Sequence, residues 1–367
     1  MAGQKRSSNH VTLLDVARAS GFSASTVSIV LNSAPLSRYV AAATKERIRE
    51  AAHALGYHPD AFARSLRRRR SNTIGLMAFD LSDPFCTQIV RGAQTQLNDT
   101  RFLPLLMDAQ NQRKQFEAYL ELLLERRVEG LIVVANWIFA GFQFLSDIEK
   151  NNVPVVVVDR DLTTSNIHSV LVDNEAGGYM AIQHLHSLGH TKIAVIRGPG
   201  ELADSEGRWS GIQRYASESG LTLDPRLVRQ LPDAADPSSG FEGGIRLTTE
   251  LLGTRKGGRK DFTAIVAFDD LTALGAVRAL RESGLRVPED CSVIGFDDIL
   301  PAAVSSPGIT TIRQPMEQMG QIAASWILEA IDSSEKTDLP PASGPKLRLL
   351  EPVLIERQST SPHKNFQ

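Results

Sequence analysis

The amino-acid sequence predicts an α/β protein in which a small helical N-terminal domain precedes a larger body of parallel β-sheets. Three observations support this prediction. Capped helical patterns fill residues 11–55. From Ser71 onward, short apolar strands alternate with amphipathic helices, the pattern typical of parallel sheets with right-handed crossovers. The charge also changes sign between the two parts, which indicates that they have different partners.

The net charge of −2 conceals a basic head on an acidic body. Residues 1–70 contain 12 Lys and Arg against 4 Asp and Glu, a net charge of +8. The remaining residues contain 28 against 38, a net charge of −10. This layout is typical of a polyanion-binding module joined to another domain. A solvated basic arm would give the same count, so the charge alone does not decide between the two interpretations.

Composition and motifs exclude several classes of protein. The two cysteines, Cys86 and Cys291, are far apart in the sequence. They therefore favour a reducing cytoplasm over a disulfide framework. There is no membrane-length apolar run and no apolar stretch resembling a signal peptide. Gly198–Ala203 formally matches a nucleotide-binding turn, but Pro199 occupies the turn and helical patterning resumes only near residue 207. We expect no enzyme activity, cofactor or metal.

The beginning of the chain has the pattern of a helix-turn-helix. Thr12 and Asp15 form a capping-box-like start for a first helix, which ends at Gly21. Ser23 caps a second helix, Ala24–Leu31, whose outward face is small and polar. Such a helix fits the major groove of DNA. Two ordinary core helices would explain the periodicity, but not the basic charge around them.

A third helix, capped by Thr44 and ended by Gly56, completes a three-helix DNA-binding unit. Asp60 can cap a short helix over residues 61–67. This segment is too short to be stably helical alone, so we expect it to become ordered on DNA or against a second copy. Leu66 would then act as a wedge in the minor groove. A flexible basic linker is the alternative.

The body contains enough strands for two sheets. The predicted strands are Thr73–Phe79, Phe102–Asp108, Gly130–Ala135, Val153–Asp159, Ser169–Val172, Lys192–Arg197, Ala264–Ala267 and Ser292–Phe296. The clearest predicted helices are Gln112–Arg127, Ala176–Leu188, Leu271–Ser283 and Met316–Ile331. A single sheet rarely spans roughly 290 residues, so two sheets with a cleft between them are expected. The last residues, Ser359–Gln367, are expected to be frayed.

These motifs resemble the lac repressor type (LacI/GalR) family. The resemblance rests on Thr12–Asn32, Gly56–Pro59 and Ala63–Leu66 in the head, and on Asp83–Phe85, Arg126–Val133, Val172–Asn174, Phe268–Asp270, Gly295–Asp297, Thr310–Pro315 and Leu350–Arg357 in the body. It therefore extends over nearly the whole chain. It implies a helix-turn-helix headpiece, a hinge helix and a sensor domain of the type I periplasmic-binding-protein fold, with two subdomains around an effector.

The resemblance also implies domain boundaries. The headpiece would span residues 1–58, the hinge helix or linker 59–71, and the effector-binding and dimerisation domain 72–358. The N-subdomain would comprise residues 72–165 and 305–333, and the C-subdomain 166–304 and 334–358, with crossovers near 160–173, 297–308 and 330–340.

Residue chemistry and the resemblance together give two sets of candidate site residues. The DNA-binding set is Thr12, Ser23, Ala24, Ser25, Thr26, Ser28, Ile29, Asn32, Arg38, Tyr57, Ala63, Leu66 and Arg67. The effector-binding set is Asp83, Phe85, Arg160, Asp173, Arg208, Phe241, Asp270 and Asp297. Most of the second set follow predicted strands, and ligands of open α/β sheets lie beyond the carboxyl ends of strands. Ile29 departs from the polar or basic residues frequent at its position in the family.

The expected function is that of a transcriptional repressor, cytoplasmic and nucleoid-associated. It would bind a pseudo-palindromic double-stranded DNA operator as a homodimer. A small polar effector, a sugar or a derivative, would control operator affinity allosterically, and no membrane partner is expected. A periplasmic-type solute-binding protein is the first alternative, opposed by the basic head. An enzyme with an α/β fold is the second, and no nucleophile–base arrangement supports it.

Overall fold

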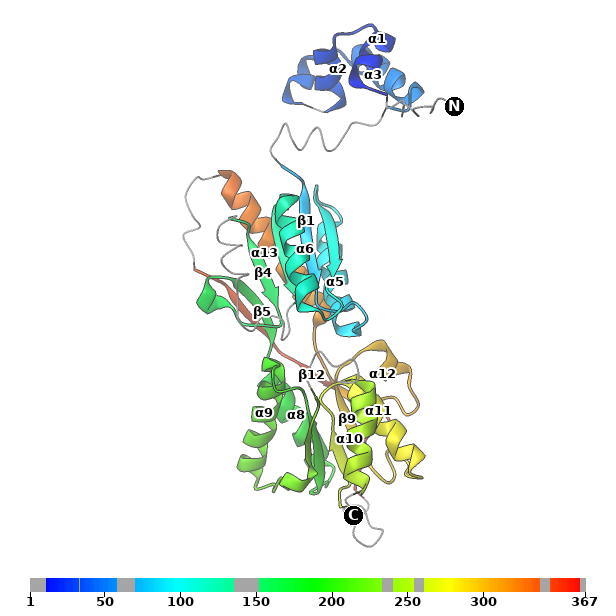
Figure 1. Cartoon of the computed structure of the whole chain (residues 1–367), viewed down its shortest axis with the longest axis vertical. Coiled ribbons are helices and arrows are strands. Elements are labelled where there is room, and N and C mark those ends of the chain that lie inside the picture. Colours follow the sequence, from blue (N-terminus) through cyan, green and yellow to red (C-terminus); the bar gives the residue numbers. More distant parts are fainter. Residues whose placement is uncertain are drawn as a thin grey trace, which may run out of the picture. The chain divides into compact units, whose positions relative to one another are not determined.

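A computed structural model describes residues 11–32, 34–57, 70–134, 152–232, 240–253, 261–336 and 344–363. The chain divides into two compact units, Met1–Ser71 and Asn72–Gln367, which we call the headpiece and the sensor domain (Figure 1). None of the described helices is both long enough and apolar enough to cross a membrane.

The headpiece is a three-helix unit with one small core. It contains α1 (Leu13–Ser20), α2 (Ala24–Leu31), the 3-10 turn η1 (Pro35–Tyr39) and α3 (Ala42–Ala54). Each helix contributes one fully buried side chain, Val16, Val27 or Ile48. Because these lie on the predicted apolar stripes, the periodicity alone located the core.

The predicted helix ends of the headpiece are confirmed except one. Thr12 and Asp15 form a reciprocal capping box, and Gly21 ends α1 with a φ of 78°. The prediction that Thr44 caps the third helix is wrong. That helix begins at Ala42, and the residue before it makes no side-chain capping bond. Alanine has the highest helix propensity, so the alanine run before Thr44 extends the helix beyond the expected cap.

The first subdomain of the sensor is a parallel sheet of order β11-β5-β4-β3-β1-β2. Its strands are β1 (Thr73–Ala78), β2 (Leu103–Asp108), β3 (Gly130–Val134), β4 (Val155–Val158), β5 (His168–Val172) and β11 (Leu347–Leu350). Its helices are α5 (Pro84–Leu97), α6 (Arg113–Glu125) and α13 (Met316–Lys336). The central strands β3 and β4 are buried along their whole length, as expected for a sheet covered on both faces.

The second subdomain is a sheet of order β12-β10-β9-β8-β6-β7, in which only β12 is antiparallel to its neighbour. Its strands are β6 (Ile193–Arg197), β7 (Val228–Gln230), β8 (Ala264–Val266), β9 (Ser292–Asp297), β10 (Thr310–Arg313) and β12 (Val353–Ile355). Its helices are α8 (Asn174–Ser187), α9 (Ala203–Ser219), α10 (Phe241–Gly253), α11 (Asp270–Glu282) and α12 (Leu300–Val304). Figure 1 shows α8 and α9 on one flank of this sheet and α10 and α11 on the other, so each face has its own core.

The predicted subdomain boundaries differ from the structure: the first crossing lies at the end of the predicted range 160–173 rather than at 165, and the other two predicted crossings, 297–308 and 330–340, are wrong. Strands β5 and β11 belong to the first sheet, because β5 pairs with β4 and β11 pairs with β5. Strand β10 belongs to the second sheet, where it pairs with β9 and β12. The chain therefore crosses after Val172, between Arg313 and Met316, and between Leu350 and Val353. The polar stretch before β5 resembles a linker in sequence, but a 3-10 turn, η3 (Thr163–Ser165), returns the chain to the same sheet.

The eight predicted strands and four clearest helices are present, and the short elements were missed. The missed strands β7, β10, β11 and β12 have three or four residues each. Helix α9 begins at Ala203, earlier than the sequence suggested. The expectation of a frayed end is also wrong for Ser359, which is fully buried. Its hydroxyl donates to the carbonyl of Val293 and accepts from the backbone N–H of Thr310, which fastens the tail to the second subdomain.

Three pairs of helices touch through glycines. The pairs are α5 with α13 at Gly92 and Gly320, α8 with α9 at Gly178 and Gly211, and α10 with α11 at Gly244 and Gly275. At each of these glycines, a side-chain Cβ would lie 1.9–2.3 Å from a backbone oxygen of the partner helix. Only glycine therefore permits these crossings, which set the positions of the helices around the cleft described below.

Candidate DNA-binding surface and ligand cleft

Helix α2 of the headpiece presents a small polar surface. The hydroxyl of Ser23 caps the helix by accepting from the backbone N–H of Thr26 at 3.1 Å. Ser25 is exposed, and Ser28 and Ile29 are partly exposed beside it. At the other end, the Asn32 amide donates to the backbone oxygen of Ser28 at 2.9 Å. The first turn is thus fixed and its side chains are available, as major-groove reading requires.

The other predicted DNA-binding residues lie around this helix. Thr12 is exposed at the start of α1, and Ala24 and Tyr57 are partly exposed. Arg38 is exposed on η1, with its guanidinium 4.7 Å from the ring centroid of Tyr39, which is 72% exposed. An exposed cation held in this way can reach a phosphate. Ala63, Leu66 and Arg67 lie outside the described residues.

The sensor domain holds a cleft of about 370 Å³ between its two subdomains. It is lined by Phe79, Asp80, Ser82, Asp83, Phe85, Asn111 and Asp159 from the first subdomain, by Pro199, Leu202, Asp204, Arg208, Leu231, Gly240, Phe241, Glu242, Phe268, Asp269, Leu271 and Asp297 from the second, and by Gln314 at a crossing. Its volume is at the lower end of the range of small-molecule pockets, roughly 300–1,000 Å³. Many of these residues follow strands, which is where ligands of such sheets bind.

Five of the eight predicted effector residues line this cleft. They are Asp83, Phe85, Arg208, Phe241 and Asp297. Arg160, Asp173 and Asp270 are not among the residues that line the cleft, and their role as effector contacts stays a prediction. Asp173 caps α8 by accepting from the backbone N–H of Ala176 at 2.8 Å.

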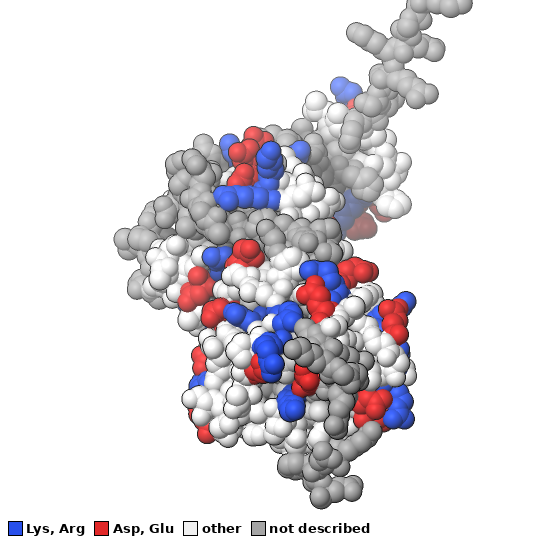
Figure 2. All heavy atoms as spheres, turned by 60° about the horizontal axis from the view of Figure 1, so that its bottom comes forward, with Lys and Arg blue, Asp and Glu red and all other residues white. Residues whose placement is uncertain are grey.

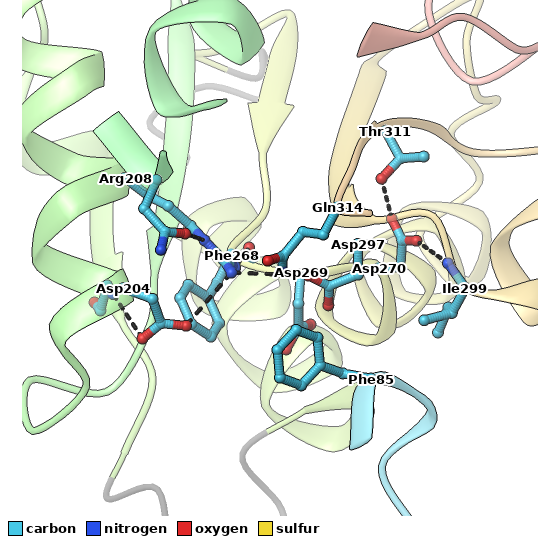
Figure 3. A network of polar contacts seen from close by, with 12 residues as sticks. Phe85, Asp204, Arg208, Phe268, Asp269, Asp270, Asp297, Ile299, Thr311 and Gln314 are labelled. Atoms are coloured by element: carbon cyan, nitrogen blue, oxygen red, sulfur yellow. Dashed lines mark hydrogen bonds and ion pairs between the residues drawn. The ribbon is translucent and has the colours of Figure 1, made fainter. Parts of the chain in front are cut away.

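Asp270 is predicted from the family resemblance and because it follows a strand, and in the structure its neighbour Asp269 lines the cleft. Asp270 is fully buried and accepts from the Ile299 N–H at 2.9 Å and the Thr311 hydroxyl at 2.6 Å, which join α11 to neighbouring segments (Figure 3). Asp269 lines the cleft and caps α11, accepting from the Thr272 N–H at 2.7 Å. The N-cap position of a helix that follows a strand was the signal that could have identified Asp269.

Arg208 is held by contacts on every side of its guanidinium (Figure 3). Its Nε donates to the Asn174 side-chain oxygen at 2.9 Å, and its Nη1 donates to the Phe268 carbonyl at 2.7 Å. Its Nη2 lies 3.4 Å from a carboxylate oxygen of Asp204 and 3.7 Å from one of Asp297. Arg208 therefore joins α8, α9 and the ends of β8 and β9.

Two aromatic rings lie close to the same guanidinium. It lies 3.7 Å from the ring centroid of Phe296 and 4.5 Å from that of Phe268. Planar cations favour such positions over ring faces. The side chain is 8% exposed, so these contacts are shielded from water.

Burial and crowding raise the pKa of most carboxyl groups in the cleft. The pKa of Asp83 rises to about 7, first because of burial and then because Asp269, Asp80 and Asp204 are nearby. Burial also raises the pKa of Asp269 and places the pKa of Asp159 and Asp297 well above the usual range, although the charge of Arg208 opposes all three of these increases. Because burial disfavours the charged form, these groups hold protons at a higher pH than free aspartates do, and the cleft is a site of crowded, poorly solvated carboxyl groups.

This crowding predicts that the ligand-free sensor becomes less stable as the pH rises. Asp83 holds its proton more tightly when folded than when unfolded, because its folded pKa is about 7 against an ordinary 3.8. The contribution of Asp83 to the free energy of unfolding is therefore complete below about pH 4 and is lost between about pH 4 and about pH 7. The expected loss is on the order of 4 kcal/mol.

Thermal unfolding at several pH values tests this. Asp83→Asn retains the cap on α5, since asparagine also caps helices, and removes the titrating group. Its melting temperature should depend less steeply on pH than that of the native chain. Equal slopes for both proteins would show that Asp83 does not titrate in this range.

On the face of the sensor domain that Figure 2 shows, charges of both signs are mixed. Figure 2 shows Lys and Arg lying among Asp and Glu over the visible face of the sensor domain. Many form surface ion pairs, such as Arg214 with Glu175 and Arg278 with Glu282. The concentration of carboxylates in the cleft is therefore a local feature.

Two family models match the chain. The model described as bacterial regulatory proteins, lacI family, matches residues 12–60, and the model of the periplasmic binding protein-like domain matches residues 182–360. The HTH-type transcriptional repressor PurR of Aliivibrio fischeri is 33% identical over 351 residues, which covers 95% of this chain and 98% of the relative. The HTH-type transcriptional regulator DegA of Bacillus subtilis is 30% identical over 353 residues, covering 96% and 98%.

Solved structures that are similar to this chain cover both its headpiece and its sensor domain. The lac repressor dimer bound to operator and the anti-inducer ONPF matches with a TM-score of 0.81 at 28% identity, covering 96% of this chain and 99% of that chain. The transcriptional regulator CelR–cellobiose complex matches with a TM-score of 0.68 at 28% identity, covering 95% and 99%.

Proposed function

Because the chain belongs to the lacI family of bacterial regulatory proteins, we propose that it binds a pseudo-palindromic operator as a homodimer and that a small polar ligand in the sensor cleft controls this binding. The chain is a DNA-binding transcriptional repressor of that family rather than an enzyme. It would act in the cytoplasm, on the nucleoid.

The observation that supports operator binding most strongly is the recognition surface of α2. A capped helix presents Ser25 and Ser28 on a small outward face, in a unit that carries the basic charge of the chain. Hydroxyl groups can donate to or accept from base edges, while Ile29 can contact a thymine methyl group. The exposed Arg38 supplies a phosphate contact that fixes the position without reading sequence.

A homodimer follows from symmetry. The lac repressor was solved as a dimer on its operator, and the fold matches over nearly the whole of both chains. Two copies of α2 related by a two-fold axis would read two half-sites about one helical turn of DNA, or a multiple of it, apart.

The cleft between the subdomains supports small-molecule control. Both subdomains contribute to its lining, so a ligand there would bind one relative arrangement of the subdomains better than another. Similar regulators were solved with cellobiose and with ribose. A sugar or a sugar derivative is accordingly the ligand we propose.

Selection from a pool of random DNA duplexes tests operator binding. The native chain should enrich a two-fold symmetric sequence, and footprinting should show both half-sites protected. Ser28→Ala should weaken binding roughly tenfold through loss of one hydrogen bond at each half-site. Ser219→Ala, an exposed position on α9, is the matched control. Protection of one asymmetric half-site by a monomer would contradict the proposal.

A further inference from the structure

The charges that line the cleft are almost all negative. Of the described residues that line it, only Arg208 is basic. Three aspartates come from the first subdomain and three from the second: Asp80, Asp83, Asp159, Asp204, Asp269 and Asp297. Both walls are therefore lined with acidic side chains.

Arg208 does not provide a free anion-binding group. Its Nε and Nη1 donate to Asn174 and Phe268, and its Nη2 faces Asp204 and Asp297. An anionic ligand would have to displace these partners and would meet the remaining carboxylates. The start of α9 also disfavours an anionic ligand, because Asp204 occupies the first helical turn, where a phosphate would otherwise bind.

What the cleft offers instead is hydrogen-bond acceptors. Ionised carboxylates only accept hydrogen bonds. Gln314 is 3% exposed, its Nε2 donates to Asp297 at 2.7 Å, and its Oε1 has no hydrogen-bond partner among the described residues. Buried acceptors without a donor are costly, so they favour a ligand that is rich in N–H or O–H groups.

Aromatic rings in the cleft favour a cation as well. Phe85 points from the first subdomain toward the group of carboxylates (Figure 3), and Phe241 lines the cleft from the second. Ring faces beside carboxylates attract ammonium groups. The described residues contain no group of three His, Cys, Asp or Glu placed to hold a metal ion, so the arrangement suits an organic cation.

We propose that the cleft binds a positively charged, amine-bearing small molecule, such as an amino sugar or a polyamine, and that this cation links the carboxylates of the two subdomains. This inference rests on the proposed function, because it names the class of ligand in the same cleft: an amino sugar is a sugar derivative of the kind proposed above, and a polyamine would take the place of the sugar. Burial is the largest cause of the raised pKa of Asp83, and Asp269 and Asp204 on the opposite wall raise it further. A cation between the walls removes that repulsion and stabilises a closed arrangement.

Thermal shift with matched series of compounds tests the proposal on the full chain. One series is glucosamine, glucose and gluconate, and the other is putrescine, butanediol and succinate. In at least one series, the amine should raise the melting temperature by on the order of 5 °C at saturating concentration, and its neutral and anionic counterparts should not. A neutral or anionic compound that stabilises as well as the amine would overturn the proposal. So would the absence of stabilisation by either amine.

Charge-removing variants provide the second measurement. Asp269→Asn preserves the cap on α11, so its fold is retained while one carboxylate is lost. The affinity for the stabilising amine should fall roughly tenfold. Glu121→Gln removes an exposed carboxylate of α6, outside the cleft, and should leave the affinity unchanged. Equal affinities of the native chain and Asp269→Asn would contradict a role for the charge.

The two proposals fail separately. If the operator selection succeeds and only neutral or anionic compounds stabilise the chain, operator control stands and the inference of a cationic ligand is wrong. If the selection yields no symmetric site, the proposed function is wrong, whatever the thermal shifts show.

Discussion

Replacement of Arg208 by alanine is expected to lower the free energy of unfolding of the sensor domain by about 3 kcal/mol or more. The guanidinium makes hydrogen bonds to Asn174 and the Phe268 carbonyl, and it lies beside Asp204 and Asp297. Truncation leaves these buried groups without their partner and opens a space between the rings of Phe268 and Phe296. Urea unfolding followed by tryptophan fluorescence measures the loss.

The pH dependence of this loss separates its electrostatic part from lost packing. Arg208 opposes the increase in the pKa of Asp159 and Asp297, so without it both carboxyl groups hold protons more strongly. Protonation removes the unpaired charge, and the destabilisation should therefore be smaller at about pH 5 than at about pH 8. Arg208→Lys keeps the charge but not the planar fork, and should lose about half as much stability. If the loss of stability were the same at both pH values, lost packing alone would explain it.

The helices in the described part of the headpiece could be predicted almost completely because their signals are local. The capping box of Thr12 and Asp15, the glycine at the end of α1 and the cap at Ser23 each act within one turn of chain. The buried residues Val16, Val27 and Ile48 follow from periodicity alone. The error at Thr44 has the same origin, since a good cap residue competed with a run of alanines that is itself a good helix former.

The errors in the sensor domain concern partners that are distant in the chain. Whether β5 continues the first sheet depends on its pairing with β4, and β11 has an exposed edge whose sequence does not reveal its neighbour. Asp269 and Asp270 are adjacent and chemically identical, yet one faces the cleft and the other is bound by Ile299 and Thr311. Local sequence cannot distinguish them, because α11 and the segments packed around it decide which carboxylate is buried.

Replacement of Gly211 by alanine is expected to cost the sensor domain at least about 3 kcal/mol, above the usual cost of adding a methyl group to a packed core. The added Cβ would lie 1.9 Å from the backbone oxygen of Glu175 and 2.7 Å from the backbone nitrogen of Tyr179. Because both atoms belong to the backbone of α8, no side-chain rotation relieves the contact, and the two helices must separate. Helices α8 and α9 also provide Asn174, Asp204 and Arg208, so the cleft should lose ligand affinity together with stability.

The direction of the change in stability distinguishes a steric conflict from an effect of helix propensity. Alanine is a better helix former than glycine by up to about 1 kcal/mol, so a substitution without steric conflict should be neutral or stabilising. Gly253, in the last turn of α10, has no heavy atom within 4 Å of an added Cβ and provides that control. The urea concentration at the unfolding midpoint should therefore fall for Gly211→Ala and should rise or stay unchanged for Gly253→Ala. If Gly211→Ala retained native stability, α8 and α9 would not be in backbone contact, and the position of Arg208 would need another cause.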